Sequence, residues 1–140
     1  MGEEIRYSLE LNKFLKYSIW ALPVLSAIIF IIFLIYADID NTKLLFALPF
    51  FGFAFWNWSK YFKRPVRIEV FKDYANLYNI LSKETMIKFS DIKSIESDRS
   101  KALIIRTKSD KILGINGFDE FSRFVEDVRS TNKDLLVKGL

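Results

Sequence analysis

The side chains that most often carry acid–base chemistry and bind metal ions are missing from this sequence. Its 140 residues include no histidine and no cysteine. Without histidine, the most common general base and metal ligand is absent. Without cysteine, there are no disulfides, thiol nucleophiles or thiolate metal sites. Catalytic triads built on His or Cys and His/Cys zinc sites are thereby excluded. We therefore expect no enzymatic activity, no catalytic residues, no cofactor and no metal.

The remaining candidates for chemistry are carboxylates, and their spacing is poor. Asp38 and Asp40 lie on one short polar segment where they could contact a divalent cation. Two carboxylates fall short of the six or more oxygen ligands that Ca²⁺ takes, so we interpret them as solvated turn residues. Asp91 has no second titratable residue spaced with it. We expect Asp91 to accept a hydrogen bond from a nearby backbone N–H within a turn.

A basic cluster with aromatic neighbours is the best candidate for contact with another molecule, here the membrane surface. Its members are Lys60, Lys63, Arg64, Arg67, Trp56, Trp58 and Tyr61. Trp and Tyr concentrate at the membrane–water interface, and clustered Lys and Arg attract anionic lipid head groups. The same charges also serve to set membrane topology, and both interpretations stay open. Across the whole chain, 21 basic and 17 acidic residues give too weak a positive charge to indicate nucleic-acid binding.

Two apolar segments precede this cluster and predict a hairpin of membrane helices at about residues 14–37 and 43–62. No charged residue occurs between Tyr17 and Ala37, and about 20 apolar residues suffice to cross the hydrocarbon core. The second segment, Leu44 to Ser59, is shorter, but a lysine at each end can extend its span by snorkelling. The turn between the segments is polar, and Asn41 or Thr42 is expected to cap the second helix. The competing interpretation is a buried hairpin of a soluble protein.

The orientation of this hairpin follows from the basic residues in its short flanks. Lysine and arginine are frequent before the first segment and after the second, whereas the turn carries only Lys43 beside two aspartates. We therefore expect both termini in the cytoplasm and a multi-pass protein of the cytoplasmic (inner) membrane. Residues 66–140 would then form a cytoplasmic domain.

In the C-terminal half, the apolar residues alternate as in half-buried β-strands. The expected strands are Val66–Val70, Ala75–Leu81, Thr85–Phe89, a strand that follows a tight turn near Ile92, Ala102–Thr107 and Lys111–Ile115. A helix at about residues 118–130 closes the domain, because its phenylalanines and valines recur every three to four residues. Asp119 and Glu120 are expected in its first turn, where the helix dipole favours negative charge. The tail after Ser130 shows no clear pattern.

This order of elements resembles a known family. The motifs IKFSDIKSIE (Ile87–Glu96) and LGINGFDEFSRFVEDV (Leu113–Val128) resemble those of small bacterial membrane proteins in which two N-terminal membrane helices precede a bacterial pleckstrin-homology (PH)-like domain. The resemblance implies a membrane helical hairpin plus an α+β domain. That domain would be a PH-like β-barrel or sandwich of about six or seven strands, capped by a C-terminal helix.

A PH barrel has seven strands before its helix, one more than the six expected between Val66 and Ile115. Apolar and polar residues also alternate over Ile5–Leu11. We expect this segment either to pair with the domain as a further strand or to extend the first helix. Positive-inside topology puts it on the same side of the membrane as the domain.

Together these patterns predict a non-enzymatic, membrane-anchored PH-like module for protein–protein interaction at the cytoplasmic face of the membrane. Its partners would be the lipid bilayer and a protein, with a homo-oligomer left open. Two alternatives remain: a domain that senses the membrane surface or anionic lipids, and an accessory subunit that stabilises a larger membrane complex. The sequence identifies neither the partner nor the oligomeric state.

Overall fold

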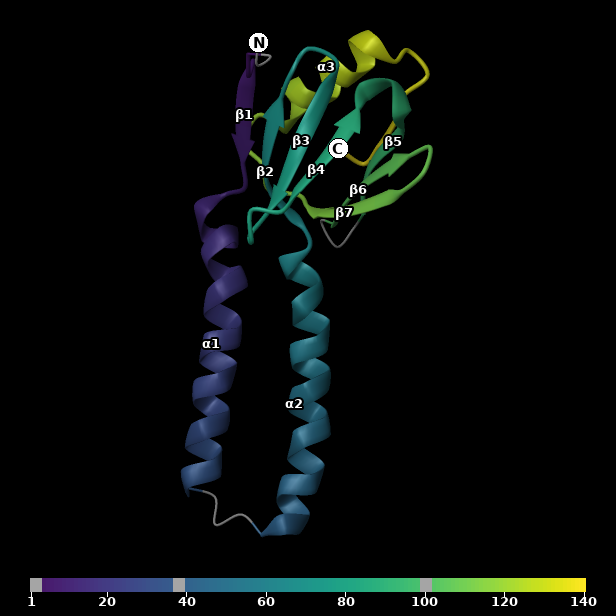
Figure 1. The fold of residues 1–140 in the computed structure, drawn as a ribbon. Coiled ribbons are helices and arrows are strands. Elements are labelled where there is room, and N and C mark those ends of the chain that lie inside the picture. The colour runs from purple at the N-terminus through teal and green to yellow at the C-terminus, as the bar shows by residue number, and fades with distance from the viewer. Residues whose placement is uncertain (1–3, 37–39, 99–101) are drawn as a thin grey trace. The chain divides into compact units, whose positions relative to one another are not determined.

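The computed structural model describes residues 4–36, 40–98 and 102–140, which form two compact units (Figure 1). The helical unit comprises Phe14–Lys63, and the β unit combines the N-terminal residues through Lys13 with Arg64–Leu140. The helical unit is therefore an insertion into the β unit. A domain boundary near residue 65 was expected, but the N-terminal segment belongs to the β unit rather than to the helical hairpin.

Two helices make up the helical unit: α1, Lys13–Tyr36, and α2, Asn41–Phe62. Aromatic side chains contact one another between the helices, with ring centroids 4.3 Å apart for Phe30 and Phe51 and 5.4 Å apart for Trp20 and Phe62. The expected cap of α2 was wrong. Asp40 is the N-cap, because its extended backbone lets its carboxylate accept a hydrogen bond from the Lys43 N–H at 2.9 Å.

Eight strands of the β unit form two four-stranded sheets, in the orders β1-β2-β3-β4 and β7-β6-β5-β8. The strands are β1 Tyr7–Glu10, β2 Pro65–Val70, β3 Tyr74–Asn79, β4 Glu84–Lys88, β5 Ile92–Ser97, β6 Ala102–Thr107, β7 Lys111–Ile115 and β8 Leu136–Lys138. All neighbours pair antiparallel except β5 and β8, which are parallel. Both sheets are open within the described residues, and no closed barrel is formed. The fold is α+β.

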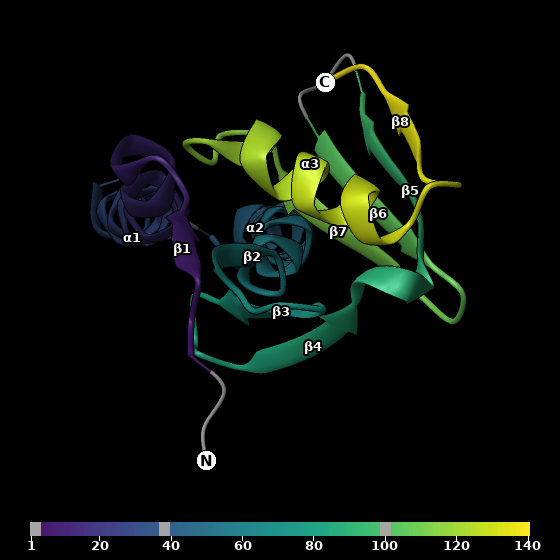
Figure 2. The ribbon, with the colours of Figure 1, turned by 90° about the horizontal axis from the view of Figure 1, so that it is seen from above.

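The core of the β unit lies between the inward faces of the two sheets and the helix α3, Phe121–Thr131 (Figure 2). A short 3₁₀ helix, η1 (Phe89–Asp91), carries Phe89 into this core, where its ring meets Phe124 edge-on with centroids 5.9 Å apart. The other large, fully buried side chains come from both sheets, from α3 and from the β-bridge residue Leu11; they are Leu11, Ile68, Val70, Ile92, Ile95, Leu103, Ile105 and Val128. The apolar residues at 89, 92 and 95 thus form the expected turn into a strand.

The N-terminal segment pairs with the domain, which confirms the strand interpretation of Ile5–Leu11. β1 lies antiparallel to β2, with Leu9 opposite Ile68. Main-chain bonds extend the pairing at both ends, from Arg6 N–H to the Val70 carbonyl and from Leu11 N–H to the Val66 carbonyl, each 2.9 Å. α1 begins only at Lys13, so the expectation of a helix extending through this segment was wrong.

The C-terminal region departs from the sequence-based expectation at both ends of its helix. α3 begins at Phe121 rather than at residue 118, because Phe118 forms a β-bridge with Leu11 and Glu120 adopts a left-handed conformation with φ of 57°. Asp119 and Glu120 therefore precede the helix instead of occupying its first turn. The tail after Ser130 also has defined structure, since it forms β8 against β5.

Small boundary shifts occur in the first sheet. β3 ends at Asn79 instead of Leu81, because the Asn79 side chain accepts hydrogen bonds from the N–H groups of Leu81 and Lys83 and closes a tight turn. Ser82 in this turn has a positive φ of 59°. β4 ends at Lys88, and Phe89 passes into η1.

Candidate interaction surfaces

The helical unit exposes large apolar side chains along its whole length. On α1, Ile28, Ile31 and Ile35 are 47%, 53% and 68% exposed. Contiguous apolar surface of this extent is unusual for a soluble monomer and marks contact with a membrane or another protein. Among the residues that the structure describes, α1 is the one helix long and apolar enough to cross a membrane.

α2 also exposes aromatic side chains but is less apolar overall. Phe46, Phe50 and Phe53 are each at least two-thirds exposed. The polar residues near its C-terminal end lower its mean hydropathy. By length and composition alone, α2 is therefore not apolar enough to count as a membrane-spanning helix. A membrane crossing by α2 therefore needs an argument other than composition.

The end of α2 holds five of the seven residues expected at the membrane surface. Trp56 is 66% exposed and Tyr61 39% exposed, whereas Trp58 packs its ring against Phe62 with centroids 4.4 Å apart. Lys60 donates a hydrogen bond from Nζ to the Asn57 side chain at 3.4 Å. Lys63 forms the C-cap of the helix. An aromatic girdle and two lysines thus occupy the last turns of one helix, as is typical of an interfacial helix end.

The other two expected residues, Arg64 and Arg67, belong to the β unit. The Arg67 guanidinium lies 3.3 Å from the Glu69 carboxylate and 4.5 Å above the centre of the Tyr78 ring. The strand register also puts Glu10 opposite Arg67. Arg67 is therefore committed to contacts within the first sheet, which makes it a poor ligand for a lipid head group.

The outward face of the first sheet is polar and carries more acid than base. Arg67 and Lys88 share it with Glu10, Glu69 and Glu84, as the alternation of side chains along paired strands requires. Tyr78 lies among these carboxylates, and its pKa is raised above the usual value of 10.0, first because neighbouring groups desolvate the phenol.

The carboxylates considered for chemistry have structural roles. The Asp91 carboxylate lies 3.4 Å from Lys108 Nζ and forms an ion pair with it, whereas its expected bond to a backbone N–H stays a prediction. Asp40 caps α2, and Asp38 lies outside the described residues. Within the described ranges, no group of three or more His, Cys, Asp or Glu side chains could hold a metal ion.

A cluster of charged and aromatic side chains fastens β1 to α3, and sequence reasoning missed it. The Tyr7 hydroxyl donates a hydrogen bond of 2.5 Å to Asp127 Oδ2, and Arg6 lies 3.6 Å from the same oxygen. The Arg123 guanidinium lies 4.1 Å above the centre of the Tyr7 ring. Burial, followed by the bond to Asp127, raises the pKa of Tyr7 far above its usual value. We call these four residues the β1 clasp.

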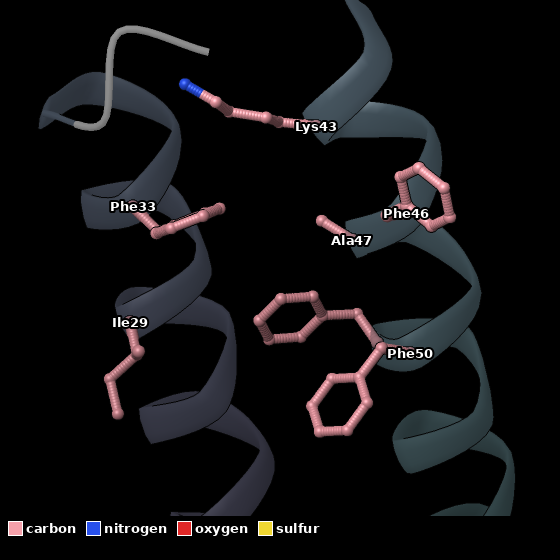
Figure 3. A pocket seen from close by; sticks show the side chains of 7 residues that line it. Ile29, Phe33, Lys43, Phe46, Ala47 and Phe50 are labelled. Carbon is pink, nitrogen blue, oxygen red and sulfur yellow. The ribbon is translucent and has the colours of Figure 1, made fainter.

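One groove of about 560 Å³ lies inside the helical unit (Figure 3). Apart from Lys43 at its mouth, all its lining residues are apolar; they are Ile29, Phe33, Phe46, Ala47, Phe50 and Phe51. A catalytic or cofactor site needs several convergent polar groups, and this groove offers one. Its chemistry suits contact with hydrocarbon.

Comparison with known proteins gives no relative for this chain: no family model, no curated protein and no solved structure matches it.

Proposed function

We propose that this protein is a membrane-tethered, non-enzymatic interaction module whose α1 and α2 both cross the membrane and whose β unit lies at the cytoplasmic face. The observation that carries the proposal is the pairing of β1 with β2 on either side of the helical insertion.

β1 directly precedes α1, and β2 directly follows α2. The two strands share a hydrogen-bonded ladder, so they must lie on the same side of any membrane that the chain enters. If α1 alone crossed, β1 and β2 would be separated by the hydrocarbon core and the ladder could not form. A crossing by α1 therefore requires a return crossing by α2, despite its lower hydropathy.

The sequence around α2 supports this return crossing. Lys43 and Lys60 lie near its two ends, where their long side chains can reach the interface from a short apolar span. Trp56 and Tyr61 are exposed close to the second lysine. The turn side has one lysine, and the flanks on the β-unit side have several, which favours a cytoplasmic β unit.

The role of the β unit is proposed from its surface. A tether raises the effective concentration of a domain for any partner held in the same membrane. The order of six strands from β2 to β7 followed by α3 favours a PH-like module, with β1 and β8 as additional edge strands. Strand edges are surfaces to which protein partners bind by adding a strand.

Labelling of single cysteines tests the topology, because the natural chain has none. Thr42→Cys reports the turn side of the helices and Ser109→Cys reports the β6–β7 turn. In intact cells a membrane-impermeant maleimide should label only Thr42→Cys, and Ser109→Cys should react after permeabilisation. Labelling of Ser109→Cys in intact cells, or extraction of the protein from membranes by alkaline carbonate, would contradict the proposal. Crosslinking in native membranes followed by mass spectrometry then tests the interaction role.

A second candidate function, recognition of anionic lipid, is favoured by the exposed lysines and tryptophan at the end of α2. Native mass spectrometry of the full chain, purified with mixed anionic and zwitterionic lipids, measures which lipids remain bound. Neutralising Lys60 and Lys63 to Gln should abolish a preference for the anionic lipid. Arg67→Gln is the matched control, because Arg67 is already paired with Glu69. An unchanged preference in the double variant would rule out this candidate.

A further inference from the structure

β4 is an edge strand with no neighbour on its outer side among the described residues. Four of its five residues are exposed, and Ile87 alone is buried. Met86 at its centre is 58% exposed. An edge of this kind carries a row of unpaired backbone N–H and C=O groups and is a template for another strand.

The hydrogen-bond pattern shows which backbone groups point outward. Phe89 donates its N–H to the Asp73 carbonyl at 3.0 Å, and Asn79 donates to the Lys83 carbonyl at 3.1 Å. Residues of an antiparallel pair bond to their partner strand alternately. Thr85 and Ile87 therefore bond toward β3, and the N–H and C=O groups of the three other β4 residues point away from the sheet. Those three are Glu84, Met86 and Lys88.

The charges of these three residues are placed so that the strand is complementary to an antiparallel copy of itself. The strand reads Glu-Thr-Met-Ile-Lys, with opposite charges at equal distances from the central methionine. In an antiparallel pair of two copies centred on Met86, each Glu84 lies opposite Lys88 of the other copy. The register that pairs these charges also aligns the outward N–H and C=O groups of the three residues. Backbone geometry and charge thus select one arrangement.

We infer that β4 is a self-association edge at which two copies of this chain pair through Glu84–Lys88 about a two-fold axis at Met86. Such an interface is isologous, since the same surface serves both copies. The first sheets of the two copies become one continuous sheet. Each copy contributes its row of outward groups, and each Glu84 meets an opposite charge on the same face.

The other edges of the described sheets lack this symmetry. β1 carries a charge only at Glu10, β7 only at Lys111, and β8 only at Lys138. Within these strand bounds, two antiparallel copies of any of them would gain no pair of opposite charges. Arg6, which precedes β1, lies four residues from Glu10 but already pairs with Asp127 at 3.6 Å. Charged residues on edge strands also serve to prevent pairing, and the experiments below separate the two roles of Glu84 and Lys88.

The proposal deepens the proposed function and rests on it for the interaction role of the β unit. Met86→Cys tests the two-fold axis directly, because the natural chain has no cysteine. Directly opposed residues in a hydrogen-bonded pair have Cα atoms about 5.5 Å apart, within the range that a disulfide spans. Met86→Cys should form a covalent dimer under mild oxidation in membranes. Lys111→Cys, on an exposed edge strand of the other sheet, is the control and should stay monomeric.

Charge exchange tests the register. Positions 84 and 88 of the two copies face each other at two places in the dimer. Glu84→Lys alone or Lys88→Glu alone therefore creates two pairs of like charges. Either change should weaken dimerisation of the full chain in detergent about tenfold. The double variant with both changes restores opposite charges and should dimerise like the natural chain. Light scattering with concentration series measures the dissociation constant.

Each outcome bears on the proposal. Absence of a Met86→Cys dimer, equal dimer yield from Lys111→Cys, or failure of the double charge exchange to restore association would overturn it. Membrane fractionation of the same samples reports the tether independently. A chain found in the membrane without the dimer contradicts the self-association edge alone, whereas a chain found outside the membrane contradicts the proposed function.

Discussion

The hydroxyl of Tyr7 donates a 2.5 Å hydrogen bond to Oδ2 of Asp127, a residue 120 positions further along the chain. It is the centre of the β1 clasp, which connects the first strand of the protein to its last helix. β1 also pairs with β2, so three parts of the sequence meet at one strand. Along the chain, β1 is followed by α1.

Removing this hydroxyl should loosen β1 without unfolding the β unit. Tyr7→Phe keeps the ring beneath Arg123 but deprives Asp127 of one donor, while Arg6 remains near the carboxylate. A loss of about 1 kcal/mol in the free energy of unfolding is expected. Urea unfolding in detergent measures it, and hydrogen exchange of the β1 amides should accelerate. Tyr17→Phe, at an exposed position of α1, is the control and should change neither.

The clasp also predicts a loss of stability in alkali. Burial and the donated hydrogen bond raise the folded-state pKa of Tyr7 above the ordinary value of 10.0. A raised pKa means that the neutral phenol is favoured by folding. Its contribution is therefore complete below about pH 10 and is lost as the pH rises toward the folded-state value.

The free energy of unfolding of the natural chain should thus fall more steeply above pH 10 than that of Tyr7→Phe. Both chains share every other titrating group, so the difference between the two curves isolates Tyr7. Parallel curves over this range would show that Tyr7 titrates normally.

Gly139 should be needed for the docking of β8. Its φ is +70°, and a Cβ at this position would lie 2.4 Å from the Ser97 carbonyl oxygen. Gly139→Ala is expected to cost about 1–2 kcal/mol from the left-handed conformation alone, and the close contact with backbone adds to this. Faster hydrogen exchange at Leu136–Lys138 would report the release of β8.

Gly52 offers a matched control for that substitution. It lies inside α2, and a Cβ there would meet nothing within 4 Å. Gly52→Ala should stabilise the helix by about 0.5–1 kcal/mol. If the two alanine variants changed stability in the same direction, the requirement for glycine at position 139 would be refuted.

Asn132 should be essential for joining α3 to η1 and β5. Its Nδ2 donates to the carbonyls of Ile92 at 2.7 Å and Phe89 at 3.4 Å, and its backbone closes the end of α3. Asn132→Ala leaves these acceptors without their donor and should lower the free energy of unfolding by about 1–2 kcal/mol. Ser130→Ala, on the exposed surface of the same helix, should have little effect. Thermal unfolding of both variants in detergent distinguishes a specific bond from general sensitivity of the helix.

The strands of the first sheet were predictable because their signal is local. Alternation over Val66–Val70 and over Ile5–Leu11 reflects one buried and one exposed face, and the structure has both as paired strands. Which strand would be the neighbour of β1 was not readable, because the partner is set by packing between residues far apart in the sequence. The hydrogen bond between Tyr7 and Asp127 could not be predicted from the sequence for the same reason.

The C-terminal errors arose where local and long-range signals disagree. Phe118 and Phe121 are spaced by three residues and fit a helical face, yet Phe118 pairs with Leu11 and only Phe121 enters α3. β8 has only three residues, so it shows no readable alternation. In the sequence, Gly139 was the one indication that an element ends there. Glycine adopts a positive φ without strain and often follows the last residue of an element. The close approach of Gly139 to the Ser97 carbonyl could be recognised only from the structure.

The insertion of α1 and α2 between neighbouring strands has a consequence for biosynthesis. β1 leaves the ribosome first, but its partner β2 is translated only after both helices. If α1 and α2 both cross a membrane, as we propose, they enter the bilayer before β1 has its partner strand. A protein inserted with the wrong number of crossings could never close this ladder, and its unmatched strand would stay open to degradation. Under the proposed topology, formation of the β1–β2 pair would then distinguish correctly inserted molecules from incorrectly inserted ones.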